Sequence, residues 1–184
     1  LRYTLQEYAE KCLVAEITRQ KVDLPAVNDR AGLATYFKFH SSDYRWEHPR
    51  YKGVVLHCVD KKTAKQAKKL LKKVPEKEWE DILRKTFNTS GDEKIKIEQG
   101  IFADGDNKYI DKLVFKKGGF ESVMSYPFTI VAGKKQKGPD DYREVIEQVR
   151  KDYRNYLNAY WERELEESGK VEINQEVLKT VNNN

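Results

Sequence analysis

The sequence predicts an α+β fold in which a small sheet-containing domain is flanked by helical segments. Three observations predict it. The stretch YKGVVLHC, from residue 51, has the β-branched core of a strand, and IEQGIF and YPFTIVAG follow it later in the chain. Amphipathic helix patterns lie before, between and after these stretches. We expect an N-terminal helical segment over 1–45, a sheet domain over 46–135, and a C-terminal long helix with its tail over 136–184.

The composition suits one globular domain or two small ones. The chain has 184 residues, is 39% hydrophobic and carries a net charge of +5, with 35 basic and 30 acidic residues interspersed. This mixture predicts a solvated surface and no nucleic-acid partner, which would require a basic stripe. No run of about 18 apolar residues occurs, so we expect no membrane-spanning segment. The chain begins at Leu1 and shows no signal-peptide pattern, which predicts a fragment of a longer protein.

The N-terminal segment carries two helix patterns. The first, from Leu5 to about Val22, should end at Pro25. Asn28 or Asp29 can cap the second, which should end near 41–44, because a short side-chain oxygen accepts the free amides of a first turn. The apolar face expected for the first helix consists of Leu5, Tyr8, Ala9, Cys12, Leu13 and Ile17, and that of the second of Leu33, Tyr36 and Phe37.

A lysine-rich helix follows the first strand, and another helix should follow Pro75. The apolar stripe of the lysine-rich helix is Ala64, Ala67, Leu70, Leu71 and Val74. Its other side carries Lys61, Lys62, Lys65, Lys68, Lys69, Lys72 and Lys73. We interpret these lysines as a solvated face, and a role at a phosphate or a membrane surface is the alternative.

The longest helix should open at Pro139 and Asp140 and stop at Gly169. A short extended piece near Val171 and a last helical turn near Val177 should follow. The tyrosine-rich stripe of the longest helix is either a core face packed on the N-terminal helices, which we favour, or a platform for peptides. The stripe consists of Tyr142, Val145, Ile146, Val149, Tyr153, Tyr156, Leu157, Tyr160 and Trp161, and we expect Trp161 to be a core residue.

Cysteine and histidine residues give no sign of a metal site or a cofactor. Cys12 and Cys58 lie in apolar stretches, where a free cysteine usually behaves as a small buried hydrophobe, and a disulfide between them is unsupported. His40, His48 and His57 lack the close spacing with a third ligand that zinc sites show. We therefore expect neither a metal nor a cofactor.

The middle of the chain resembles a parvulin-type prolyl isomerase domain. The family runs strand, helices, strand, helix and two closing strands, and this block reproduces that order. Gly100-Ile101-Phe102, Gly105 and the segment from Lys108 to Phe115 stand where the family has its Gly-aromatic-aromatic motif, Gly loop and short helix. The flanking helices are similar to those of SurA-type periplasmic chaperones. The resemblance implies a four-stranded sheet, a periplasmic location, and unfolded or proline-containing polypeptides as partners.

Departures from the family pattern argue against full isomerase activity. The two histidines of active parvulins correspond to Gly53 or Val54 on the first strand and to Thr129 on the last, so no catalytic residue is assigned. His57 is the one candidate to replace them, and a strand advances roughly 3.3 Å per residue, which should carry its ring beyond the site. The family's proline pocket is approximated by Gln99, Asn107 and Ile110. The residues expected to bind an extended peptide are Phe102, Ile110, Phe115, Phe128 and Thr129, although Phe115 and Phe128 can equally be core.

Three functions follow from these patterns. The first is a chaperone that binds unfolded outer-membrane or secreted proteins, with a degenerate parvulin-like domain. The second is an active peptidyl-prolyl isomerase with an unrecognised site, and the third is a scaffold for one defined partner. Saturable isomerase activity selects the second, broad suppression of aggregation selects the first, and binding to a single folded partner selects the third.

Overall fold

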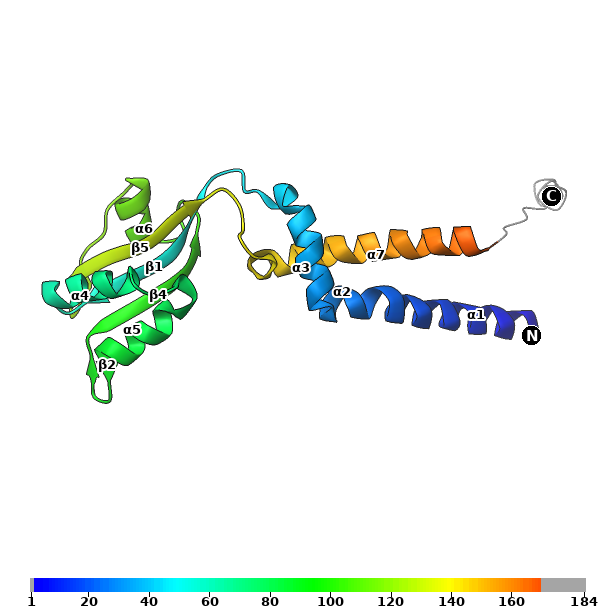
Figure 1. Cartoon of the computed structure of the whole chain (residues 1–184), viewed down its shortest axis with the longest axis horizontal. Helices are drawn as coiled ribbons and strands as arrows, with labels where there is room; N and C mark the ends of the chain where they lie inside the picture. Colours follow the sequence, from blue (N-terminus) through cyan, green and yellow to red (C-terminus); the bar gives the residue numbers. More distant parts are fainter. Residues whose placement is uncertain (1, 170–184) are drawn as a thin grey trace. The chain divides into compact units, whose positions relative to one another are not determined.

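The computed structural model describes residues 2–169 and divides the chain into two units. Unit 1 combines residues 1–41 with residues 140–184, and unit 2 comprises residues 42–139. Unit 1 is helical, whereas unit 2 contains helices and two antiparallel sheets (Figure 1). The predicted α+β class is confirmed. No helix among residues 2–169 is both long enough and apolar enough to cross a membrane. The tail predicted beyond Gly169 lies outside the described residues.

The N-terminal helical run of unit 1 continues through Pro25, so the predicted break there is wrong. Helix α1 (Arg2–Thr18) passes into a π-helical turn, η1 (Arg19–Asp23), and then into α2 (Leu24–Asn28). Pro25 occupies the first turn of α2, where a missing backbone N–H costs little. The wider turn of η1 separates Pro25 from the regular ladder of α1.

Helix α3 (Arg30–Phe39) begins at the predicted cap. The Asp29 side chain accepts a 2.8 Å hydrogen bond from the Gly32 backbone N–H. The C-terminal helix starts later than predicted, because Asp141 caps a 3₁₀ turn, η5 (Tyr142–Val145), that precedes α7 (Ile146–Ser168). Helix α7 ends at Gly169, as predicted, and the Gly169 N–H donates to the Leu165 carbonyl oxygen.

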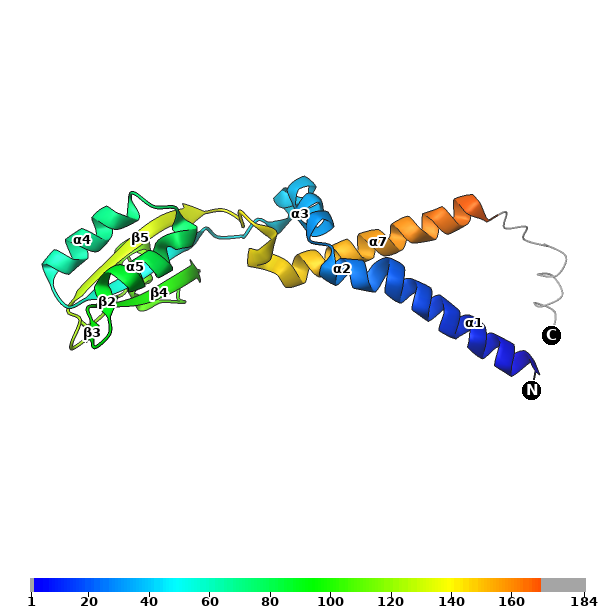
Figure 2. The same cartoon turned by 60° about the horizontal axis from the view of Figure 1, so that its bottom comes forward.

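The core of unit 1 forms where α7 packs on η1, α2 and α3. Its buried apolar residues are Val22, Ala26, Leu33, Phe37, Val149 and Tyr153. The predicted packing of α7 on the N-terminal helices is therefore confirmed for this part. Trp161 is only partly buried, so its assignment to the core is wrong. Figure 2 shows that α1 and α7 run apart beyond η1.

The apolar face predicted for α1 is exposed. Leu5, Tyr8 and Leu13 each leave more than half of their surface in solvent, and Cys12 is exposed as well. Helical spacing predicts which residues share a face, but it does not supply a partner for that face. Among the described residues, the buried part of unit 1 begins only with Val22.

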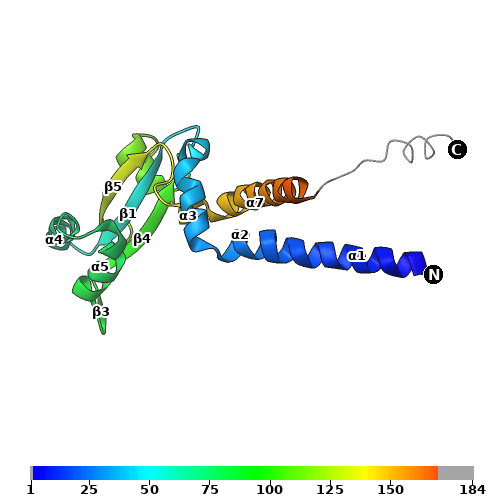
Figure 3. The same cartoon turned by 45° about the vertical axis from the view of Figure 1, so that its right-hand side comes forward.

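Unit 2 is built on a three-stranded antiparallel sheet with the order β4-β1-β5 (Figure 3). The strands are β1 (Arg50–Cys58), β4 (Ile95–Phe102) and β5 (Phe128–Gln136). The expected fourth strand is not present in this sheet. Two short strands, β2 (Asn88–Thr89) and β3 (Asp92–Glu93), instead pair with each other in a hairpin of two residues each. Segment 116–127 contributes one isolated bridge between Val123 and Tyr126.

Helices cover both faces of the central strand β1. Side chains alternate along a strand, so Val54, Leu56 and Cys58 face one layer, formed by α4 (Lys61–Leu71) and α5 (Trp79–Phe87). A 3₁₀ turn, η3 (Glu76–Glu78), precedes α5. Tyr51 and Val55 face the other layer, formed by α6 (Lys108–Ile110), the π-helical turn η4 (Asp111–Phe115) and the segment after it. The remaining element, η2 (Ser41–Tyr44), leads into β1.

A row of glycines crosses the three strands at one level. Gly53 of β1 pairs with Gly100 of β4 on one side and with Gly133 of β5 on the other. A Cβ atom on Gly53 would lie 2.2 Å from the Ala132 carbonyl oxygen, and one on Gly133 would lie 2.2 Å from the Lys52 carbonyl oxygen. The close approach of the β1 and β5 backbones therefore requires glycine at both positions.

Candidate functional site

His57 lies opposite Thr129 in the pairing of β1 with β5. Its ring points to the same face of the sheet as Val55 and Tyr51, toward α6. The Nδ1 atom is 2.9 Å from the Thr129 hydroxyl oxygen, and the Nε2 atom is 3.2 Å from Oε1 of Glu98 on β4. His57 therefore joins the side chains of all three strands.

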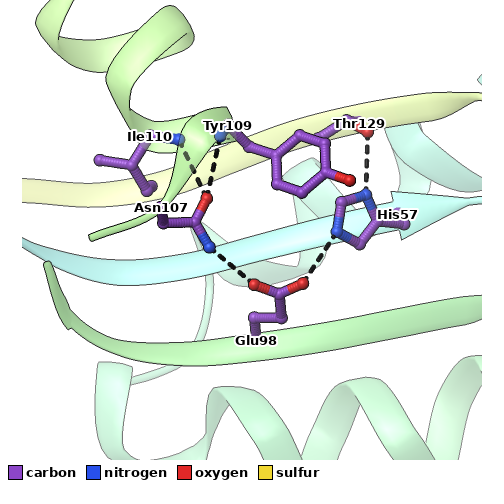
Figure 4. A network of polar contacts seen from close by, with 6 residues as sticks. All are labelled: His57, Glu98, Asn107, Tyr109, Ile110 and Thr129. Atoms are coloured by element: carbon purple, nitrogen blue, oxygen red, sulfur yellow. Dashed lines mark hydrogen bonds and ion pairs between the residues drawn. The ribbon is translucent and has the colours of Figure 1, made fainter. Parts of the chain in front are cut away.

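The hydrogen-bonded network extends from Glu98 to helix α6 (Figure 4). The Asn107 side-chain amide donates a 2.7 Å hydrogen bond to Oε2 of Glu98. The Asn107 side-chain oxygen accepts from the backbone N–H groups of Tyr109 and Ile110, at 3.0 and 3.2 Å, and so caps α6. The His57 network, defined as His57, Thr129, Glu98, Asn107 and Tyr109, thus fixes α6 to the sheet.

The buried ring of His57 limits what this network does chemically. Only 3% of the His57 surface is exposed, and the Tyr109 ring packs against the imidazole edge-on at a centroid distance of 4.5 Å. Both ring nitrogens have a side-chain partner. A general base needs a nitrogen within reach of a substrate proton, and this arrangement offers none. Glu98, in contrast, is 46% exposed at its side chain.

The register corrects one expectation about His57. Its ring was expected to lie beyond the site marked by Thr129, whereas it lies directly across from Thr129. The two positions that the resemblance assigns to the first histidine lie elsewhere. Gly53 pairs with Gly133, and Val54 faces the opposite layer of the sheet. The partners of His57 are the side chains of Thr129 and Glu98.

The five residues expected to bind peptide do not share one exposed groove. Ile110 is completely buried, and Phe102 and Phe115 are partly buried against the same cluster. Thr129 bonds to His57. Phe128 pairs with Cys58, so it points to the opposite face, where it is 40% exposed. Of the expected proline pocket, Asn107 caps α6 and Ile110 is the last residue of α6, whereas Gln99 pairs with Val54 and so lies on the other face of β4 from Glu98.

Unit 1 contains a more open candidate site, which we call the aromatic groove. It lies between α3 and α7 and has a volume of about 520 Å³. Its aromatic lining consists of Tyr36, Phe39, His40, Tyr153 and Tyr156. Phe39 is 79% exposed and Tyr156 is 50% exposed, so large apolar surface remains open to a ligand.

The rings of the aromatic groove form a connected series. The Tyr36 ring stacks on the His40 ring at a centroid distance of 4.3 Å and lies 5.5 and 5.6 Å from the rings of Tyr153 and Tyr156. Tyr156 stacks in turn with Tyr160, which is also half exposed. Aromatic pairs at these separations stabilise one another, so the groove is held in shape by its own lining.

The floor of the aromatic groove contains two polar side chains, Tyr153 and Asp29, which are hydrogen-bonded to each other. The Tyr153 hydroxyl donates a 2.9 Å hydrogen bond to Oδ2 of Asp29, whose Oδ1 caps α3. Burial, together with this bond, raises the pKa of Tyr153 to about 12. A Cβ atom on Gly32 would lie 2.1 Å from the Tyr153 hydroxyl oxygen, so glycine is required for this contact between α3 and α7.

Sequence reasoning identified one half of the aromatic groove. The tyrosine stripe of α7 was recognised as a core face or a platform, and the structure assigns Val149 and Tyr153 to the core and exposes Tyr156 and Tyr160. Phe39 and His40 were missed as lining residues. Their only signal is aromatic residues crowded at the end of α3, which does not reveal that α7 lies alongside. Within residues 2–169, no three His, Cys, Asp or Glu residues are grouped to hold a metal ion.

Comparison with protein-family models, with curated proteins and with solved structures found no match to this chain.

Proposed function

We propose that this chain is a chaperone-like protein that binds unfolded or extended polypeptide in the aromatic groove of unit 1. The observation that carries the proposal is the exposed aromatic surface of the groove, above all Phe39 and Tyr156. Tyrosine and phenylalanine rings offer large contact areas at a low cost in side-chain entropy, and they accept many sequences. A binder of unfolded chains requires this tolerance.

The exposed face of α1 supports the same function. Leu5, Tyr8, Leu13 and Val14 add apolar surface to unit 1, outside its core. Unfolded polypeptides expose apolar side chains at irregular intervals, and several separate apolar patches can hold such a chain at more than one point. Unit 1 offers such patches on α1, α3 and α7.

Unit 2 has a supporting part in this proposal, as a parvulin-like domain without full isomerase activity. The order of strand β1, two helices, strand β4 and a short helix supports this part of the proposal, but one closing strand, β5, follows where the resemblance implied two, and the sheet has three strands where four were expected. The buried His57 argues against catalysis, because an isomerase must hold a twisted amide in an accessible, dry pocket. The proposed periplasmic location and the proposed outer-membrane or secreted clients rest on the resemblance alone.

The test is the suppression of aggregation of a chemically unfolded client by the full chain, measured by light scattering at rising protein concentration. Suppression should saturate near stoichiometric amounts and should extend to several unrelated clients. The double variant Phe39→Ser/Tyr156→Ser should lose most of it. Phe128→Ser is the matched control, because Phe128 is exposed in unit 2 and should leave the suppression unchanged. Binding confined to one folded partner would instead indicate a scaffold.

An active prolyl isomerase is the second candidate function, favoured by the placement of His57 between Thr129 and Glu98. The isomerisation rate of a proline-containing tetrapeptide distinguishes it from the chaperone. We expect no acceleration over the spontaneous rate. A saturable acceleration that His57→Gln abolishes would establish the isomerase and would mean that Tyr109 moves away from the imidazole in solution.

A further inference from the structure

Helix α4 carries five lysines on its solvent side and two more follow its end, and we call these seven residues the lysine face. Thr63, Ala64, Ala67 and Leu71 are buried toward the sheet. Segment 61–73 contains no acidic residue. Six of the seven lysines, with Gln66, line an open hollow of about 630 Å³ on this face. The lysine face consists of Lys61, Lys62, Lys65, Lys68, Lys69, Lys72 and Lys73.

The helical spacing arranges these lysines in two rows. Residues three or four apart are neighbours on one side of a helix. One row is therefore Lys61, Lys65, Lys68 and Lys72, and the other is Lys62, Lys69 and Lys73. At a rise of 1.5 Å per residue, the first row is about 16 Å long. Together the rows form a patch of like charge.

The lysine face lowers the stability of the helix that carries it. Each pair of lysines three or four residues apart is repulsive, and Lys61 and Lys62 in the first turn interact unfavourably with the helix dipole. Among residues 2–169, none of the seven ammonium groups forms an ion pair with a carboxylate. The carboxylate nearest in sequence, Asp60, accepts a 2.7 Å hydrogen bond from the Thr63 backbone N–H and interacts electrostatically with Lys62.

We propose that the lysine face binds the surface of a bilayer that contains anionic phospholipids. Charge complementarity carries this inference, because seven ammonium groups that form no ion pair within residues 2–169 match a plane of phosphate headgroups. The hollow between the lysine stems leaves room for headgroup oxygens to reach the ammonium groups. Leu70, beside Lys69, is partly buried against the core of unit 2, and no large apolar side chain of α4 is exposed, so the contact is electrostatic and peripheral and inserts nothing into the bilayer.

Three features favour a bilayer over a nucleic acid. Proteins that track a single nucleic-acid strand combine a basic groove with aromatic side chains that stack on bases, and the lysine face has no aromatic residue. All seven cations are lysines, which act as point charges, and the face lacks the arginine forks that recognise individual phosphates. The third feature is an acidic stretch that follows the lysine face in sequence and consists of Glu76, Glu78, Glu80 and Asp81. A diffuse anionic surface suits such a patch better than a long polyanion.

The experiment is co-sedimentation of the full chain with phospholipid vesicles. We expect binding to phosphatidylcholine vesicles that contain about 30% phosphatidylglycerol and none to phosphatidylcholine alone. Binding should fall at least tenfold at about 0.5 M salt, where the screening length shrinks to a few ångströms. The variant Lys61→Gln/Lys65→Gln/Lys68→Gln/Lys72→Gln should lose tenfold or more in partitioning, since each lysine near an anionic surface contributes about fivefold. Glutamine keeps the helix propensity, so the variant should fold.

The matched control removes the same number of charges elsewhere. Lys21→Gln/Lys38→Gln/Lys112→Gln/Lys151→Gln changes four exposed lysines on other elements and should change partitioning by less than about twofold. An equal loss in both variants would overturn the proposal, since net charge alone would then drive the binding. Absence of binding to anionic vesicles, or tighter binding to single-stranded nucleic acid or polyglutamate at equal charge concentration, would also overturn it. Aggregation assays test the aromatic groove separately, so either proposal can fail without the other.

Discussion

The Tyr153 hydroxyl donates a 2.9 Å hydrogen bond to Oδ2 of Asp29, across a separation of 124 residues in sequence. Asp29 uses its other oxygen to cap α3, and Gly32 leaves the space that the Tyr153 hydroxyl occupies. One carboxylate thus starts a helix of the N-terminal segment and attaches it to α7. The aromatic groove is built on this contact.

Removal of either partner of this bond should destabilise unit 1. We expect Tyr153→Phe to lower the free energy of unfolding by about 1 kcal/mol, the worth of one partly buried hydrogen bond. Asp29→Ala should cost about 2 kcal/mol, because the cap of α3 is lost as well. Chemical denaturation of both variants and of the double variant should give a coupling energy of about 1 kcal/mol. Tyr156→Phe, at a half-exposed position, is the control and should change stability by less than about 0.5 kcal/mol. A coupling energy near zero would contradict the contact.

The same bond should give the stability of the chain a dependence on alkaline pH. The pKa of Tyr153 is raised to about 12 by burial and by the Asp29 carboxylate, whereas the unfolded chain has a tyrosine pKa of about 10. The unfolded state therefore loses this proton first, and the contribution of Tyr153 is present below pH 10 and declines as the pH rises toward 12. The stability difference between the wild type and Tyr153→Phe should shrink over this range. A difference that stays constant to pH 12 would show that Tyr153 titrates normally.

Gly53→Ala should disrupt the central sheet of unit 2. The new methyl group would lie 2.2 Å from the Ala132 carbonyl oxygen, so the β1 and β5 backbones would have to separate. We expect a loss of roughly 2–3 kcal/mol, measured by chemical denaturation. Gly119→Ala is the matched control, because nothing lies within 4 Å of its Cβ position. Equal stability of the two variants would mean that the strands do not approach this closely.

The two cysteines should differ in reactivity toward a thiol reagent. Cys12 is exposed, whereas Cys58 is buried and burial raises its thiol pKa to about 11. We expect one rapid alkylation per native chain and two after denaturation, counted by mass spectrometry. Cys12→Ser should remove the rapid reaction. A native chain in which both thiols react rapidly would show that the layer of α4 and α5 opens readily.

A chain that ends at Gly138 should aggregate. It lacks α7, which in the full chain packs on η1, α2 and α3, and so uncovers Val22, Ala26 and Leu33. Apolar surface left without its partner favours association. Light scattering and size-exclusion chromatography measure the result. A truncated chain that remains monomeric and unfolds cooperatively would refute the packing described for unit 1.

Local features of the fold were predictable from the sequence. The spacing of Ala64, Ala67 and Leu71 predicts α4, and a single carboxylate, Asp29, marks the start of α3. These signals act over a few residues, within one or two helical turns. Pro25 shows the limit of the local rules, since a π-turn before it allows the helical run to continue.

The site depends on contacts that the sequence does not encode locally. The register that places His57 opposite Thr129 joins strands 72 residues apart, and a different register would have moved the ring to another neighbour. The aromatic groove likewise needs α3 beside α7. The exposed face of α1 has the same helical spacing as a buried face, so periodicity alone did not distinguish the two.

The division of the chain has a consequence for the order of its folding. Unit 2 is continuous in sequence, so it can fold during synthesis before α7 emerges, whereas the core of unit 1 must wait for Val149 and Tyr153. Once folded, unit 2 holds its own ends together through the bond from the Trp46 N–H to the Lys137 carbonyl oxygen. The intervening chain then behaves as a short loop, and the entropic cost of joining α3 to α7 becomes small. Early folding of the inserted unit therefore speeds the closure of the helical one.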